Sequence, residues 1–121
     1  MRTEEMLKGL RPEIQKEKTE VTEIELFQNE VLRPILKFQH DLWLLEWQQN
    51  AIFLVVKFLN NQTEQRKMLQ ILFSKNPGLV QRYIGMTAGY FTLTEFQYYL
   101  ETKNEVDKRI KELLLTRFLS Y

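Results

Sequence analysis

Two opposed rows of apolar side chains between residues 31 and 59 limit the fold more than any other feature of this sequence. Advancing about 100° per residue sorts the side chains of a helix by face. The first row consists of Val31, Ile35, Phe38, Leu42, Leu45, Gln49, Ile52, Val56 and Leu59. The tryptophan row, on the opposite face, consists of Leu32, Leu36, His40, Trp43, Trp47, Ala51, Leu54 and Phe58. A surface helix normally has a single apolar face, so we expect this helix to be covered on both sides.

Two arrangements provide that cover. Either other helices of the same chain pack on both rows, or one row contacts another chain. Tryptophan is enriched at interface hot spots, a homodimer interface resembles a core cut in half, and two-fold dimers are the commonest oligomers. We therefore predict a homodimer through the tryptophan row. The interface candidates are Leu36, His40, Trp43, Trp47, Leu54 and Phe58.

The helix that carries both rows has a clear start signal. Thr22 and Glu25 have the spacing of a capping box, in which the threonine caps the first turn and the glutamate bonds back to it. A long helix is expected from there to about Asn60. Pro34 removes one backbone hydrogen bond and crowds the preceding turn, which predicts a kink near that residue.

The remaining sequence also has helical spacing, and no stretch alternates as a strand does. Further helices are expected from Thr63 to about Phe73, from Pro77 to near Gly89 and from Thr92 to Leu119. Lys103 and Asp107 stand one turn apart and are placed to pair. The predicted fold is all-α, a compact bundle of four or five helices around the long kinked helix. Residues 1–20 are expected to form a helical arm or frayed segment, and residues 21–121 a single domain.

Composition narrows the classes of function. The 121 residues carry 17 basic and 16 acidic side chains, so the net charge of +1 lacks the basic excess of a nucleic-acid binder. The absence of cysteine excludes disulfides, cysteine nucleophiles and thiolate metal sites. The longest apolar run, residues 51–56, is far shorter than the roughly 20 residues of a membrane span. A cytoplasmic protein without nucleic-acid or membrane partners is expected.

Candidate chemistry is sparse. His40 is the one histidine, and no carboxylate stands three or four residues from it on the same face. Because a catalytic zinc site normally needs three protein ligands, we interpret His40 as a structural or interface residue. The sequence predicts no catalytic, cofactor-binding or metal-binding residue.

An alternative function is a small-molecule binding protein or a metal-free enzyme. Its pocket between helices would be lined by Trp43, Trp47, Tyr83, Tyr90 and Tyr99. Polar groups such as His40 or Gln49 would converge on it, as they do in ligand sites. The two functions differ in one observable: an interaction protein closes the tryptophan row with protein atoms, whereas a binding protein leaves a cavity there.

The stretch GMTAGYFTLTEF, residues 85–96, has the appearance of a glycine loop. Thr92 and Glu95 repeat the capping-box spacing, so the second half is expected to start a helix. We expect Gly85 to allow another backbone to approach closely, and Gly89 to end the preceding helix with a positive φ. This favours a tight joint between two helices over a phosphate-binding loop.

The segments LRPILKF (residues 32–38) and IGM leading into GYFT (residues 84–92) together resemble a family of short, all-helical bacterial proteins with no established function. Some members carry an automated glyoxalase-type label. The resemblance covers roughly residues 27–119 and implies a helical fold. Metal-dependent glyoxalase folds build their site from histidine and glutamate ligands on strands, which this sequence does not offer, so no catalytic residue is carried over.

Overall fold

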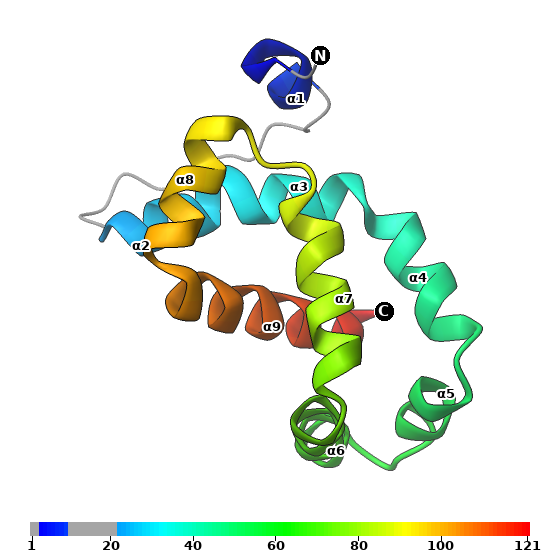
Figure 1. Cartoon of the computed structure of the whole chain (residues 1–121). Helices are drawn as coiled ribbons and strands as arrows, with labels where there is room; N and C mark the ends of the chain where they lie inside the picture. Colours follow the sequence, from blue (N-terminus) through cyan, green and yellow to red (C-terminus); the bar gives the residue numbers. More distant parts are fainter. Residues whose placement is uncertain (1–2, 10–21) are drawn as a thin grey trace.

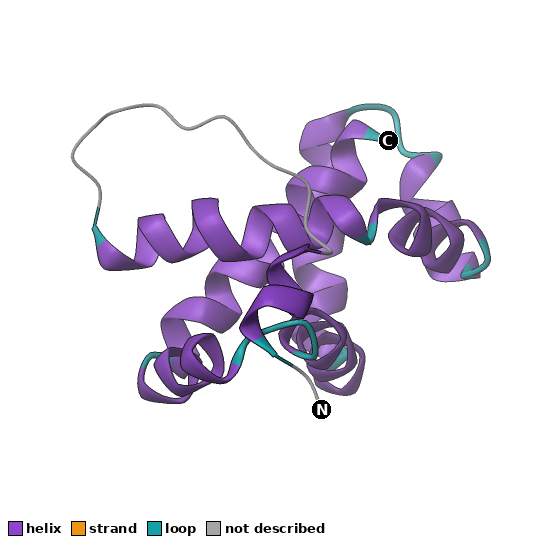
Figure 2. Ribbon diagram, turned by 90° about the horizontal axis from the view of Figure 1, so that it is seen from above, coloured by secondary structure: helices purple, strands orange, loops and turns teal. Residues whose placement is uncertain are grey.

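The computed structural model describes residues 3–9 and 22–121, and every regular element in those ranges is helical (Figure 2). The predicted all-α fold is confirmed. In chain order the elements are α1 (Glu4–Gly9), α2 (Glu23–Phe27), the π-helical turn η1 (Gln28–Leu32), α3 (Arg33–Phe38), α4 (His40–Gln48), α5 (Ala51–Lys57), α6 (Gln62–Lys75), α7 (Pro77–Ala88), α8 (Leu93–Glu101) and α9 (Lys103–Ser120). Within the predicted arm, α1 is described, and residues 10–21 lie outside the described ranges.

The distortion expected at Pro34 takes the form of a π turn immediately before it. In η1 the N–H of Arg33 donates to the carbonyl of Gln28, five residues back. Pro34 has no N–H, and in a regular α-helix its ring would crowd the preceding turn. The wider π turn accommodates the proline without ending the helix. The chain therefore continues in helical geometry from α2 through η1 into α3.

The long helix expected to reach Asn60 is instead interrupted twice more, so that prediction is wrong beyond residue 38. At Gln39 the backbone leaves helical geometry, and the side-chain Nε2 donates to the carbonyl of Met86, 3.0 Å away. At Asn50 the backbone becomes extended, and Oδ1 accepts from the N–H of Ile52 to start α5. Figure 1 shows the result: α3, α4 and α5 turn successively around the outside of α7.

The core gathers around α9, which crosses the middle of the molecule in Figure 1 and packs against α6, α7 and α8. Its buried side chains are Val106, Ile110, Leu114, Leu115 and Phe118. They contact the aromatic residues of α4 and α5: Trp47 meets Phe118 edge-on at 5.3 Å, and Phe53 lies 5.6 Å from the same ring. One apolar core thus joins helices from both halves of the chain.

The stretch GMTAGYFTLTEF is the joint between α7 and α8, and α8 begins with a complete capping box. Thr92 Oγ1 accepts from the Glu95 N–H at 3.1 Å, and Glu95 Oε1 accepts from the Thr92 N–H at 2.8 Å. Gly89 follows the last residue of α7 and ends it as expected, but the positive φ expected there and the close backbone approach expected at Gly85 are wrong. Gly89 has a φ of −59°, and Gly85 is exposed, with open space where a Cβ would stand.

The last predicted helix is divided at Thr102. Its hydroxyl donates to the carbonyl of Tyr98 at 2.7 Å, and α9 begins at the next residue. The predicted pair on α9 is confirmed, because Lys103 Nζ lies 2.9 Å from Asp107 Oδ2. These local hydrogen bonds turn α8 and α9 into separate helices that pack against each other.

Candidate functional site

The tryptophan row of α4 lies in the core of its own chain. Trp43 and Trp47 are both 0% exposed. Their rings stack with centroids 6.0 Å apart, and Tyr83 of α7 meets Trp43 edge-on at 5.1 Å. Leu36 of α3 is buried in the same cluster. The prediction that these three row members form an interface is therefore corrected: side chains from α7 and α9 already cover them.

Packing alone holds the two indole rings in place. Neither Trp43 Nε1 nor Trp47 Nε1 has a hydrogen-bond acceptor among the described residues. Buried polar atoms are usually paired, so the two N–H groups reduce the stability that burial of the rings provides. The two indole rings provide apolar contact surface, and neither of them can act as an acid, a base or a nucleophile.

The tryptophan row is also split along its length. Because the chain turns at Asn50, α5 does not continue the line of α4. Leu54 and Phe58 consequently point away from the core, and Phe58 is 86% exposed. These two interface candidates remain available to a partner, although they no longer share a surface row with the tryptophans.

The first row is the one that reaches solvent on α4. Leu42 and Leu45 of α4 are exposed, as are Phe38 at the end of α3 and Ile52 at the start of α5, and we name these four side chains the outer face of α4. Beside it lies an open hollow of about 520 Å³ between α4 and α7. Leu42, Leu45 and Met86 supply apolar walls, while the secondary candidate Gln49 lies at its edge. The structure thus leaves exposed the middle of a row that sequence reasoning expected to be covered, whereas Val31, Ile35 and Val56 of the same row are buried.

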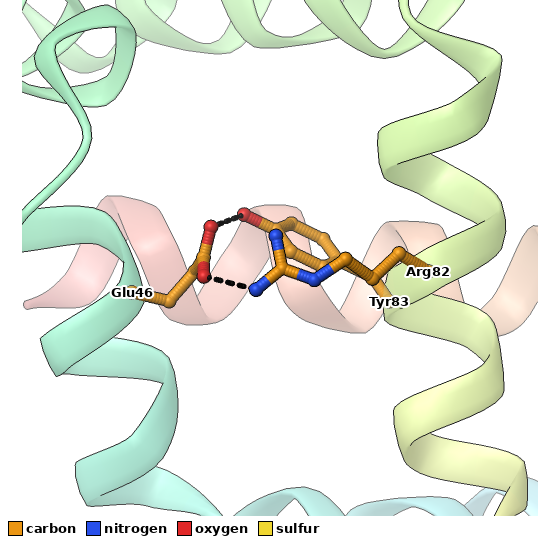
Figure 3. A network of polar contacts seen from close by, with 3 residues as sticks. All are labelled: Glu46, Arg82 and Tyr83. Carbon is orange, nitrogen blue, oxygen red and sulfur yellow. Dashed lines mark hydrogen bonds and ion pairs between the residues drawn. The ribbon is translucent and has the colours of Figure 1, made fainter.

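A charged network stands at one side of this hollow (Figure 3). Glu46 of α4 accepts from Arg82 Nη2 at 2.8 Å through Oε1, and from the Tyr83 hydroxyl at 3.0 Å through Oε2. Burial and the hydrogen bond to Glu46 raise the pKa of Tyr83 above its usual value. Both carboxylate oxygens are therefore engaged. The arrangement fastens α4 to α7 and leaves Glu46 poorly placed to act as a general base.

The other secondary candidates lie in separate aromatic clusters. Tyr90 packs edge-on against Phe38 at 5.6 Å. Tyr99 donates from its hydroxyl to Asp107 Oδ1 at 2.7 Å, and burial followed by this hydrogen bond raises its pKa. Tyr83 belongs to the tryptophan cluster instead. The aromatic pocket expected between helices is corrected accordingly, since the structure does not bring its tyrosines to one place.

His40 faces α9 instead of the tryptophans. Its Nδ1 lies 3.1 Å from Nη1 of Arg117, a residue that sequence reasoning did not single out. Both line a second hollow, of about 390 Å³, together with Arg33. The spacing of Arg33 and His40, seven residues or two helical turns, was the one sequence signal of this grouping. No sequence pattern indicated Arg117, because its position in this hollow depends on how α9 packs.

The described residues contain no group of three or more histidine, aspartate or glutamate side chains that could hold a metal ion. Over residues 3–9 and 22–121, no helix combines the length and apolar character that a bilayer crossing needs. In comparisons with known proteins, no family model, curated protein or solved structure matches the chain. The resemblance to short helical bacterial proteins stays a prediction.

Proposed function

We propose that this protein is a non-enzymatic interaction module that acts as a homodimer through the outer face of α4. The observation that carries the proposal is the exposure of four large apolar side chains of the first row on three consecutive helices: Phe38, Leu42, Leu45 and Ile52. Exposed apolar surface of this kind marks interaction sites more often than scattered single residues do. A cytoplasmic location is part of the same proposal.

The concentration of apolar surface in this region supports the proposal. Seven of the fourteen exposed large apolar side chains in the described ranges fall between Phe38 and Phe58. Figure 1 shows α4 along one edge of the molecule, with α5 following it, where no other described helix lies outside them. Association would remove this surface from water, which is the main favourable term in protein association.

A second copy of the chain suits the charges beside the outer face. Lys37 and Asp41 flank it on one side, and Glu46 with Arg82 on the other. The two positive and two negative groups balance, so a copy of the same surface meets no net like charge. In a two-fold interface each surface contacts its own counterpart, and a neutral apolar surface satisfies that condition.

The same region supports the small-molecule alternative less well. The hollow between α4 and α7 is open, and its one carboxylate, Glu46, is already bonded to Arg82 and Tyr83. Ligand sites normally enclose most of their ligand and direct a few polar groups into the cavity. This hollow has apolar walls suited to a helix of a partner chain.

Light scattering tests the proposal with a matched pair of variants. Leu45 is 60% exposed on α4, and Leu100 is 61% exposed on α8. We expect the wild type and Leu100→Lys to show twice the mass of the chain at micromolar concentration. Leu45→Lys should show the mass of one chain, because a lysine at the centre of the interface buries an unpaired charge.

Two results would overturn the homodimer. One is a wild-type chain that stays monomeric up to the highest soluble concentration. The other is equal dimerisation of Leu45→Lys and the wild type. Far-ultraviolet circular dichroism on all three proteins confirms that the helices are intact, so a change of mass reports association and not unfolding.

A further inference from the structure

The hollow beside α3 and α9 is lined by polar side chains that can donate hydrogen bonds. These donors are Gln28, Arg33, His40, Thr116 and Arg117, and the buried side chain of Leu36 forms part of the apolar wall. Its volume of about 390 Å³ falls within the range of small-molecule sites, roughly 300–1,000 Å³. It lies apart from the outer face of α4.

The contact between Arg117 and His40 defines the proton positions in this hollow. A guanidinium group only donates, so His40 Nδ1, 3.1 Å from Arg117 Nη1, must be the acceptor. The imidazole proton is then on Nε2, where it can donate to a ligand. Arg117 is half-buried, and burial followed by the charge of Arg33 lowers its pKa. Arg33, which is exposed, is the second cationic group that lines this hollow.

Within the described ranges these cations have no acidic side chain beside them. Tyr121, the last residue of the sequence, also lines the hollow, and its main-chain oxygen accepts from Lys57 Nζ at 2.7 Å. None of the side chains that line this hollow is acidic, in contrast to the other described hollows, which include Glu46, Asp107 or Glu105. Two other described arginines each have a carboxylate partner: Arg66 bonds to Glu112, and Arg82 to Glu46. Like charges repel each other, so a bound anion would relieve the repulsion between the half-buried Arg117 and the exposed Arg33.

We propose that this hollow is a binding site for a phosphoryl group, held by Arg33, Arg117 and His40. Guanidinium groups bind phosphate oxygens with paired, charge-assisted hydrogen bonds. The Nε2 proton of His40 and the hydroxyl of Thr116 offer further donors, whereas the Ser120 hydroxyl already donates to the Arg117 carbonyl at 3.0 Å. The apolar wall at Leu36 and Leu113 can hold the organic part of a phosphate monoester.

Isothermal titration calorimetry tests the site with two probes, inorganic phosphate and phenyl phosphate, at constant ionic strength maintained with sodium chloride. We compare the wild type, Arg33→Gln, Arg117→Gln and the control Arg66→Gln. Loss of one guanidinium contact is expected to raise the Kd about tenfold or more. Arg66→Gln should bind as the wild type does. Arg33 is exposed, so its variant keeps the test valid even where Arg117→Gln destabilises the chain.

The two probes separate the sources of the phosphoryl group. Tighter binding of phenyl phosphate supports a small phosphate monoester as ligand, and equal binding supports free phosphate. The proposal is overturned where the wild type binds neither probe above the chloride background. It is also overturned where Arg66→Gln weakens binding as much as Arg33→Gln, since that result indicates general attraction to positive charge.

Discussion

Helix α4 has two apolar faces, one of which is buried and the other exposed to solvent. The face with Trp43 and Trp47 is fully buried by α7 and α9, whereas the outer face with Leu42 and Leu45 reaches solvent. Both faces have the same helical spacing. Helical periodicity therefore predicts how many faces of a helix are apolar. Which of those faces the chain itself buries depends on helices that are distant in the sequence.

The largest expected effect is on the buried face. Trp47→Ala should lower the free energy of unfolding by about 3–5 kcal/mol, because it removes a large ring and leaves a cavity beside Phe118. Leu45→Ala, on the outer face, should change it by less than about 0.5 kcal/mol in the monomer. Urea denaturation at low protein concentration measures both. Similar losses for the two variants would refute the division between the faces.

An intermediate effect is expected at the boundary between the two faces. Glu46→Ala removes the acceptor of the buried Tyr83 hydroxyl, which should cost about 1–3 kcal/mol. Glu112→Ala removes only the exposed partner of Arg66 and should cost less than about 1 kcal/mol. Denaturation curves of the two variants give the comparison. Adding Tyr83→Phe to Glu46→Ala should restore part of the loss, and no recovery would show that the hydroxyl is not the cause.

The smallest effect is a pH dependence of the buried face. Burial raises the pKa of Tyr83 above its unfolded value of 10.0. The stability that this neutral phenol provides is complete below pH 10 and is lost as the pH rises toward the folded pKa. The wild type should therefore lose about 1 kcal/mol more than Tyr83→Phe between pH 9 and pH 11. Urea denaturation at the two pH values measures it, and equal losses would contradict the assignment.

Sequence reasoning located the helix starts that depend on neighbouring residues. Thr92 with Glu95 and the pair Lys103–Asp107 are such cases, since both partners lie within one turn. It missed the interruption at Gln39, whose side chain bonds to a carbonyl 47 residues away. No proline or glycine marks that position. A tertiary hydrogen bond accompanies the interruption there, and single-sequence patterns do not contain it.

The candidate site at His40 shows the same limit: its residue type is visible in the sequence, and its long-range partner is not. His40 was singled out because it is the one histidine of the chain, but its expected neighbours were the tryptophans of its own row. The structure pairs it with Arg117, 77 residues away, because α9 packs across α3 and α4 in the folded chain. Residue type could identify a candidate, whereas its partner depended on the arrangement of helices.

The π turn before Pro34 determines which side of the helix Gln28 and Arg33 occupy. Residues five apart in an α-helix stand about 140° apart around the axis, which would send Gln28 and Arg33 to different sides. In η1 the bond between positions 28 and 33 stacks them, and both line the hollow beside α9. One additional residue in the helix thus brings an amide and a guanidinium group together. A single-residue deletion between the two positions would set them four apart in a regular α-helix, about 40° around the axis, and the amide and the guanidinium group would stay on one side.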